Sequence, residues 1–153
     1  DEEKSWIKAN PEINVGNERF WPPMDFYSED RAMGYSIDLI NLIAKEIGIE
    51  INYVSGLPWS QLLEALKSGE IDVLPAISKT NKREAYIRFS KPYIKLPYVK
   101  VINSSIENDD NNDLEGKSVA VFKGSNIENA LKLNYPSVKL VYLNSIEEAR
   151  QKV

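Results

Sequence analysis

Arg83 lies where the chain could bind an anion. It follows the apolar run 71–77, and Thr80 and Asn81 precede it as candidate caps of a short helix. The first turn of a helix exposes unpaired N–H groups and positive potential, both of which favour an anion. A guanidinium adds a planar partner that can hold a carboxylate through two hydrogen bonds. With the nearby hydroxyl of Ser78, these residues predict a site for a small carboxylate.

An ordinary surface ion pair is the competing interpretation of Arg83. Glu84 follows it directly, and Asp72 lies in the preceding apolar run. Such pairs are common on protein surfaces and stabilise little. The sequence leaves both interpretations open.

The segment "KGSNIE" repeats the pattern later in the chain. Gly124 is placed at a tight turn before a helix, and Ser125 is its expected N-cap, with Glu128 completing a capping box. Gly124, Ser125 and Asn126 could together offer N–H groups and polar side chains to an anion. The alternative is a capped helix with no ligand.

Aromatic residues crowd the segment 17–35, which reads as a turn-rich loop. Trp21 in this loop and Trp59 before a later helix could be walls for a ligand. They could equally be side chains that pack on the core.

Strand-like and helix-like patterns alternate along the chain, which predicts βαβ units, mainly parallel sheets and an α/β fold. Ser36, Gly48 and Gly69 are the expected helix ends, and Ser145 with Glu148 forms a second capping box. Ligands of such sheets bind beyond the carboxyl ends of the strands, which here means the segments 17–35, 75–83 and 123–127.

The expected strands are 12–16, 49–54, 71–77, 118–123 and 138–143. The expected helices are 35–48, 60–69, 125–133 and 145–153, with a short one from Asn81. We expect residues 93–102 to be extended and residues 103–117 to be a solvated connection.

Composition excludes several classes of function. The 153 residues contain no Cys and no His, which removes disulfides, Cys nucleophiles, His bases and the common zinc sites. The net charge of −4, with both signs mixed, argues against nucleic acid as a partner. No apolar run reaches the ~20 residues of a membrane span. The opening "DEEKSW" is unlike a signal peptide, so we expect a trimmed mature domain with no cofactor and no metal.

Three stretches together resemble the family 3 bacterial extracellular solute-binding proteins. They are the entry "W-x-x-x-x-P-x-I-x-V-G" from Trp6 to Gly16, the stretch "DVLPAISKTNKR" ending at Arg83, and "LEGKSVAVFKGSNIE". The chain is most similar to Venus-flytrap sensor domains that precede membrane-bound histidine kinases and diguanylate cyclases. The resemblance runs from Trp6 to the end of the chain.

The resemblance implies a two-lobed periplasmic binding protein type II fold that closes on a small ligand. It implies that the ligand carboxylate is held by Ser78 and Arg83, near the backbone of Ala76. The second-lobe clamp falls on Gly124, Ser125 and Asn126, and the aromatic walls fall on Trp21 and Trp59.

The chain also departs from the family pattern. An acidic residue for the ligand amino group and the return crossing of the first lobe would lie beyond residue 153. We therefore expect a truncated fold, with incomplete lobe 1 at residues 1–98 and the hinge crossing and first part of lobe 2 at residues 99–153. Either the chain is a fragment or a second chain completes it. Pro75 and Ala76 replace hydroxyl residues of amino-acid binders, which leaves the ligand class open.

The functional prediction is a periplasmic, extracytoplasmic sensor domain, membrane-anchored only through a tethering segment outside this chain, that binds an amino acid or organic acid. A binding protein for an ABC amino-acid transporter is the alternative, followed by the accessory domain of a lytic transglycosylase. We expect the chain not to be an enzyme. Cyclohexadienyl dehydratase-like chemistry would need cleft carboxylates, for which the loop offers Glu18 and Asp25.

Overall fold

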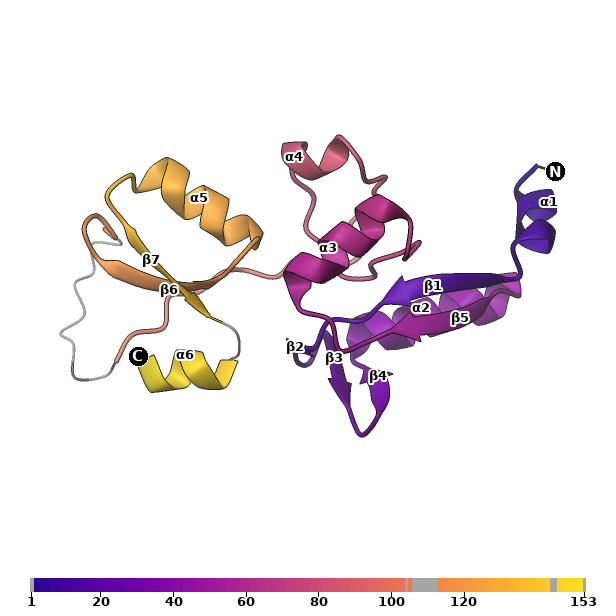
Figure 1. Ribbon diagram of the computed structural model, residues 1–153, viewed down its shortest axis with the longest axis horizontal. Coiled ribbons are helices and arrows are strands. Elements are labelled where there is room, and N and C mark those ends of the chain that lie inside the picture. Colours follow the sequence, from indigo (N-terminus) through magenta and orange to yellow (C-terminus); the bar gives the residue numbers. More distant parts are fainter. Residues whose placement is uncertain (1, 104, 106–112, 144–145, 153) are drawn as a thin grey trace. The chain divides into compact units, whose positions relative to one another are not determined.

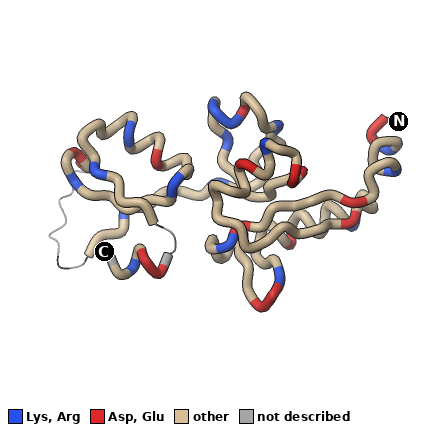
Figure 2. Tube along the Cα trace, in the orientation of Figure 1, with Lys and Arg blue, Asp and Glu red and all other residues tan. Residues whose placement is uncertain are grey.

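The computed structural model describes residues 2–103, 105, 113–143 and 146–152. They form two compact units, Asp1–Ser78 and Lys79–Val153. Acidic and basic residues are interspersed along the described parts of both units (Figure 2). Among the helices in these ranges, none has both the length and the apolar character needed to span a membrane.

A pair of parallel strands is the centre of the first unit (Figure 1). Strand β1 (Glu12–Gly16) pairs in register with β5 (Glu50–Val54), so the two predicted strands are confirmed. On the other side of β1, Val73 forms a single parallel bridge with Val15.

The predicted strand at 71–77 is therefore wrong in its extent. Its backbone still follows β1: Asp72 N–H donates to Asn14 O at 2.8 Å, and Gly16 N–H donates to Val73 O at 2.9 Å. Pro75 has no N–H to continue this ladder, which accounts for the early end of the pairing.

The segment predicted as a loop contains a small antiparallel sheet. Its strands β2 (Phe20–Trp21), β3 (Asp25–Ser28) and β4 (Arg31–Met33) pair in chain order. Glu29 and Asp30 form the β3–β4 turn with positive φ angles of 52° and 57°. The Pro22–Pro23 peptide bond is cis.

Two helices accompany the parallel strands. Helix α2 (Tyr35–Ile47) begins within the predicted range, but its N-cap is Gly34 and not Ser36, which is buried inside the first turn. Helix α3 is Trp59–Ser68. Gly48 and Gly69 end these helices in the left-handed conformation, as predicted.

The core of the first unit lies under α3. Its centre is formed by Leu62, Ala65 and Ile71, which are at most 4% exposed. The half-buried residues that pack against it are Val54, Leu57, Trp59, Leu66 and Leu74. No helix or strand is predicted before residue 12, yet Glu2–Ala9 forms helix α1, with acidic residues in its first turn and Lys8 in its last.

The second unit repeats the parallel arrangement. Strands β6 (Ser118–Phe122) and β7 (Lys139–Leu143) pair in register, connected by α5 (Asn126–Asn134) and followed by α6 (Ile146–Lys152). Among its described residues, Val121, Leu131 and Leu143 are buried and apolar. Residues 85–103 contain no helix or strand, and the capping residue predicted at Ser145 lies outside the described residues.

Candidate functional site

Helix α4 (Asn81–Glu84) places Arg83 as predicted, one turn after its cap. Thr80 is the N-cap, and its Oγ1 accepts a hydrogen bond from Arg83 N–H at 3.3 Å. The Arg83 side chain is almost fully buried, with 6% of the residue exposed. Its Nη2 donates to the carbonyl oxygen of Gly124 at 3.1 Å. Two predicted site residues, 41 positions apart, are therefore in direct contact.

Burial lowers the pKa of the Arg83 guanidinium, while the nearby hydroxyl groups of Tyr86 and Tyr98 raise it. An arginine starts from so high a pKa that it stays charged at neutral pH. The structure thus holds a desolvated cation at the turn before α5. Such a group interacts more strongly with an anion than an exposed one does.

The two acids considered as alternative partners of Arg83 have contacts of their own. Glu84 forms an ion pair with Lys79 at 2.7 Å. Asp72 accepts a hydrogen bond from Asn14 N–H at 2.8 Å. The 6% exposure of Arg83 also distinguishes it from an ordinary surface arginine.

The turn before α5 differs in detail from the predicted capping box. Ser125 is the N-cap, but its side chain makes no capping hydrogen bond. Glu128 reaches one residue further back, and its carboxylate accepts from Gly124 N–H at 2.7 Å. Gly124 adopts φ 78°, which suits glycine and turns its N–H toward that carboxylate.

These contacts change which donors the turn can offer. Gly124 N–H donates to Glu128, and Ser125 N–H donates to Phe122 O at 3.2 Å. The Ser125 hydroxyl is buried and makes no hydrogen bond within the described chain. Asn126 Oδ1 accepts a hydrogen bond from the Tyr98 hydroxyl. The Ser125 hydroxyl is therefore the polar atom of this turn that a ligand would best satisfy.

The predicted residues of the first unit lie in several environments. Trp21 is on β2 and 37% exposed, whereas Trp59 opens α3 and packs on the core. Ala76 is buried, and Ser78 is half-buried. The contacts of Trp59 match the packing interpretation, while the exposure of Trp21 leaves its ring surface accessible.

A buried polar network surrounds Asn17, a residue that the sequence pattern did not single out. Asn17 is fully buried; its amide Nδ2 donates to Asp25 Oδ1 at 2.6 Å and to Phe26 O at 3.2 Å. Ser55 Oγ donates to Asn17 Oδ1 at 2.8 Å, and Glu18 N–H donates to Asp25 Oδ1 at 3.2 Å. A polar residue directly after the buried end of β1 was the available signal.

Burial raises the pKa of Asp25 to about 7, because desolvation outweighs the hydrogen bonds from Asn17 and Glu18. Burial also raises the pKa of Glu18. Within the described ranges, no cluster of three or more acidic side chains could hold a metal ion. The network thus contains one buried acid, Asp25, and next to it the half-buried acid Glu18.

The parallel strands and their helices form an α/β fold that matches solved structures of the periplasmic binding protein type II class. The chain belongs to the bacterial extracellular solute-binding proteins, family 3, which it matches over residues 13–117. The resemblance stated from the sequence and the fold class are confirmed.

Known relatives include binding proteins and sensors. The chain is 39% identical over 124 residues to a probable histidine-binding protein of Campylobacter jejuni, covering 78% of this chain and 47% of that protein. It is 26% identical over 149 residues to the virulence sensor protein BvgS of Bordetella pertussis, covering 96% of this chain and 12% of BvgS.

A solved structure gives the same fold. An ancestral arginine-binding protein bound to glutamine superimposes with a TM-score of 0.73 and 32% identity. The alignment covers 93% of this chain and 64% of that protein. The chain thus spans about half of the Campylobacter protein and less than two thirds of the ancestral one.

Proposed function

We propose that this chain is part of an extracytoplasmic sensor domain that binds a small carboxylate-bearing solute, an amino acid in the first instance. Membership of the solute-binding family supports the binding role, and the similarity to BvgS supports the sensor role. The observation that carries the proposal is the buried, charged Arg83 in contact with the Gly124 turn. In this proposal the domain is membrane-anchored through a segment outside the chain, and ligand binding shifts a two-state equilibrium.

The proposed ligand carboxylate is held by Arg83 with the hydroxyl groups of Ser78 and Ser125. Trp21 is the proposed wall for the ligand side chain, because its ring is accessible. The complete proposed set is Trp21, Trp59, Ala76, Ser78, Arg83, Gly124, Ser125 and Asn126. Residues 1–98 remain the proposed share of lobe 1, and residues 99–153 that of the hinge and lobe 2.

Delivery of an amino acid to an ABC transporter is the second candidate function. The 39% identity to a probable histidine-binding protein favours it. Both candidates are binding roles without catalysis. They differ in what the gene encodes after residue 153: a sensor requires a transmembrane helix and a signalling domain.

Titration calorimetry with matched ligands tests the shared binding claim. L-Histidine, L-arginine and L-glutamine are compared with histamine and agmatine, which keep the side chain of an amino acid but lack its carboxylate. We expect one or more of the amino acids to bind and the two amines to fail. Equal binding of an amino acid and its decarboxylated partner would remove the carboxylate site from the proposal.

A further inference from the structure

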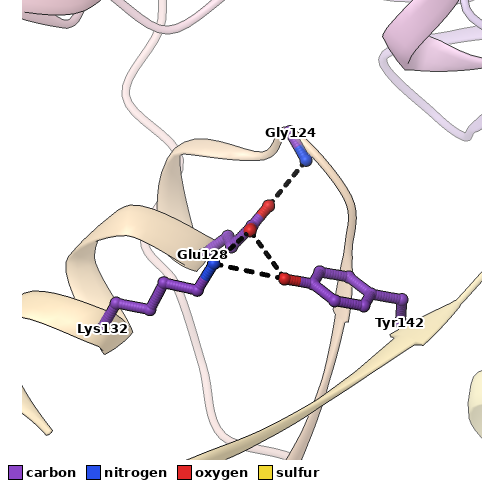
Figure 3. Close-up of polar contacts among 4 residues, drawn as sticks. All are labelled: Gly124, Glu128, Lys132 and Tyr142. Carbon is purple, nitrogen blue, oxygen red and sulfur yellow. Dashed lines mark hydrogen bonds and ion pairs between the residues drawn. The ribbon is translucent and has the colours of Figure 1, made fainter. Parts of the chain in front are cut away.

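Glu128 lies at the centre of a hydrogen-bonded cluster around the Gly124 turn (Figure 3). Its Oε2 accepts from Gly124 N–H at 2.7 Å. Its Oε1 accepts from Lys132 Nζ and from the Tyr142 hydroxyl, both at 2.8 Å. Lys132 Nζ also donates to the Tyr142 hydroxyl at 3.2 Å, which closes a triangle of three side chains.

Two elements of the second unit supply this cluster. Glu128 and Lys132 lie one turn apart on α5, and Tyr142 comes from β7. The Glu128 side chain is only 12% exposed, whereas that of Lys132 is 54% exposed. Lys132 and Tyr142 therefore hold Oε1 of the Glu128 carboxylate, while Oε2 binds Gly124.

The Glu128 carboxyl group is ionised at neutral pH. Burial on its own raises the pKa of this carboxyl group, but the hydrogen bonds from Lys132, Gly124 and Tyr142 outweigh burial and lower the pKa to about 2. An ionised acceptor makes a shorter and stronger hydrogen bond to a backbone N–H than a neutral one does.

Gly124 is restrained on both sides. Its N–H is held by Glu128, and its carbonyl oxygen accepts from Arg83 Nη2 at 3.1 Å. Glycine has more backbone freedom than any other residue, so an unrestrained Gly124 would sample many orientations of that carbonyl. Arg83 could then follow several carbonyl positions rather than one.

We propose that Glu128 is a positioning residue, whose carboxylate, braced by Lys132 and Tyr142, fixes the Gly124 turn and through its carbonyl orients the Arg83 guanidinium. The inference rests on the proposed function for its effect on ligand affinity. The coupling from Glu128 through Gly124 to Arg83 is independent of any ligand. A purely structural Glu128 would stabilise the start of α5 without affecting Arg83.

Nuclear magnetic resonance of the full 153-residue chain separates these roles. The test variants are Glu128→Gln, which keeps the side-chain shape, and Lys132→Met, which removes one brace from an exposed position. Glu147→Gln is the matched control, because Glu147 forms an exposed ion pair with Arg150 on α6. Circular dichroism verifies that each variant is folded.

The readouts are the Gly124 amide proton shift, the exchange rate of the Arg83 Nη protons and the affinity for L-histidine, L-arginine and L-glutamine. Glu128→Gln should move the Gly124 signal upfield, accelerate Arg83 exchange several-fold and weaken the binding of any amino acid that binds by about tenfold. Lys132→Met should change the same three quantities in the same directions but by smaller amounts. The control should change none of them.

An unchanged Arg83 signal in Glu128→Gln would overturn the proposal, whether or not the Gly124 signal moves. If the wild-type chain binds none of the three amino acids, the proposed function loses its support. The Gly124 and Arg83 signals still decide the positioning role in that case, so the two failures are distinguishable.

Discussion

The guanidinium of Arg83 donates a hydrogen bond from Nη2 to the carbonyl oxygen of Gly124, 41 residues further along the chain. A carbonyl takes one N–H of a guanidinium that has five. This contact holds a planar, charged group of the kind that pairs with a carboxylate through two hydrogen bonds. This relationship underlies the first prediction.

Arg83→Ala should reduce the affinity for the bound amino acid by about 2–5 kcal/mol, because the ligand carboxylate loses its charged partner. Arg83→Lys should recover only part of the loss, since an ammonium group cannot form the planar two-bond contact. Titration calorimetry measures both values. Lys82→Ala is the control, being an exposed cation on the same helix. An Arg83→Ala variant that binds like the control would exclude Arg83 from the site.

Trp21→Ala and Trp59→Ala should have different effects. Trp21 is 37% exposed on β2, so its loss should weaken ligand binding and leave the unfolding midpoint within a few degrees of wild type. Trp59 packs against Leu62, Ala65 and Ile71, so its loss should cost about 2–4 kcal/mol of unfolding free energy. Urea denaturation and calorimetry on both variants measure the contrast. A cooperative loss of folding in Trp21→Ala would assign that ring to packing instead.

The regular elements could be predicted because their signals are local. β1, β5, β6 and β7 are short segments with β-branched residues, and each follows from the alternation of strand and helix. Gly48 and Gly69 mark helix ends because a left-handed residue is needed there. The predicted N-cap at Ser36 is wrong, because Gly34 caps α2 without a side-chain hydrogen bond.

The site details depend on contacts that are distant in sequence. Residue types alone do not indicate that the Glu128 carboxylate accepts from Gly124 N–H and not from Ser125 N–H. Nor do they indicate that Lys132 and Tyr142 donate hydrogen bonds to Glu128. The strands β2 to β4 were missed because each has two to four residues, too few for a period-2 pattern. Helix α1 was missed because it has no buried face.

Gly34→Ala should destabilise the chain by more than about 2 kcal/mol, because the position combines positive φ with a backbone clash. Gly34 has φ 119°, and an added Cβ would lie 2.6 Å from the backbone oxygen of Met24. Gly56→Ala is the matched control, with φ 83° and open space around the Cβ. It should cost only about 1 kcal/mol. Equal unfolding midpoints for the two variants would contradict the importance of the Gly34–Met24 contact.

Asp25 should make the first unit less stable as the pH rises. Its pKa is raised from 3.8 to about 7 in the folded chain, so the folded state binds more protons than the unfolded state between these values. Stability from the protonated acid is fully present below pH 3.8 and is lost as the pH passes through about 7. The raised pKa of Glu18 adds a slope of the same sign.

Asp25→Asn should therefore flatten most of this slope and raise the unfolding free energy at pH 8. The substitution is conservative, because Asn17 Nδ2 and Glu18 N–H both donate to Oδ1, an oxygen that asparagine retains. Urea unfolding at several pH values between about 4 and 8 measures the slope for the variant, the wild type and the exposed-site control Glu46→Gln. A slope that survives unchanged in Asp25→Asn would show that the buried Asp25 carboxyl group does not titrate in this range, and the pH dependence would then have to come from Glu18.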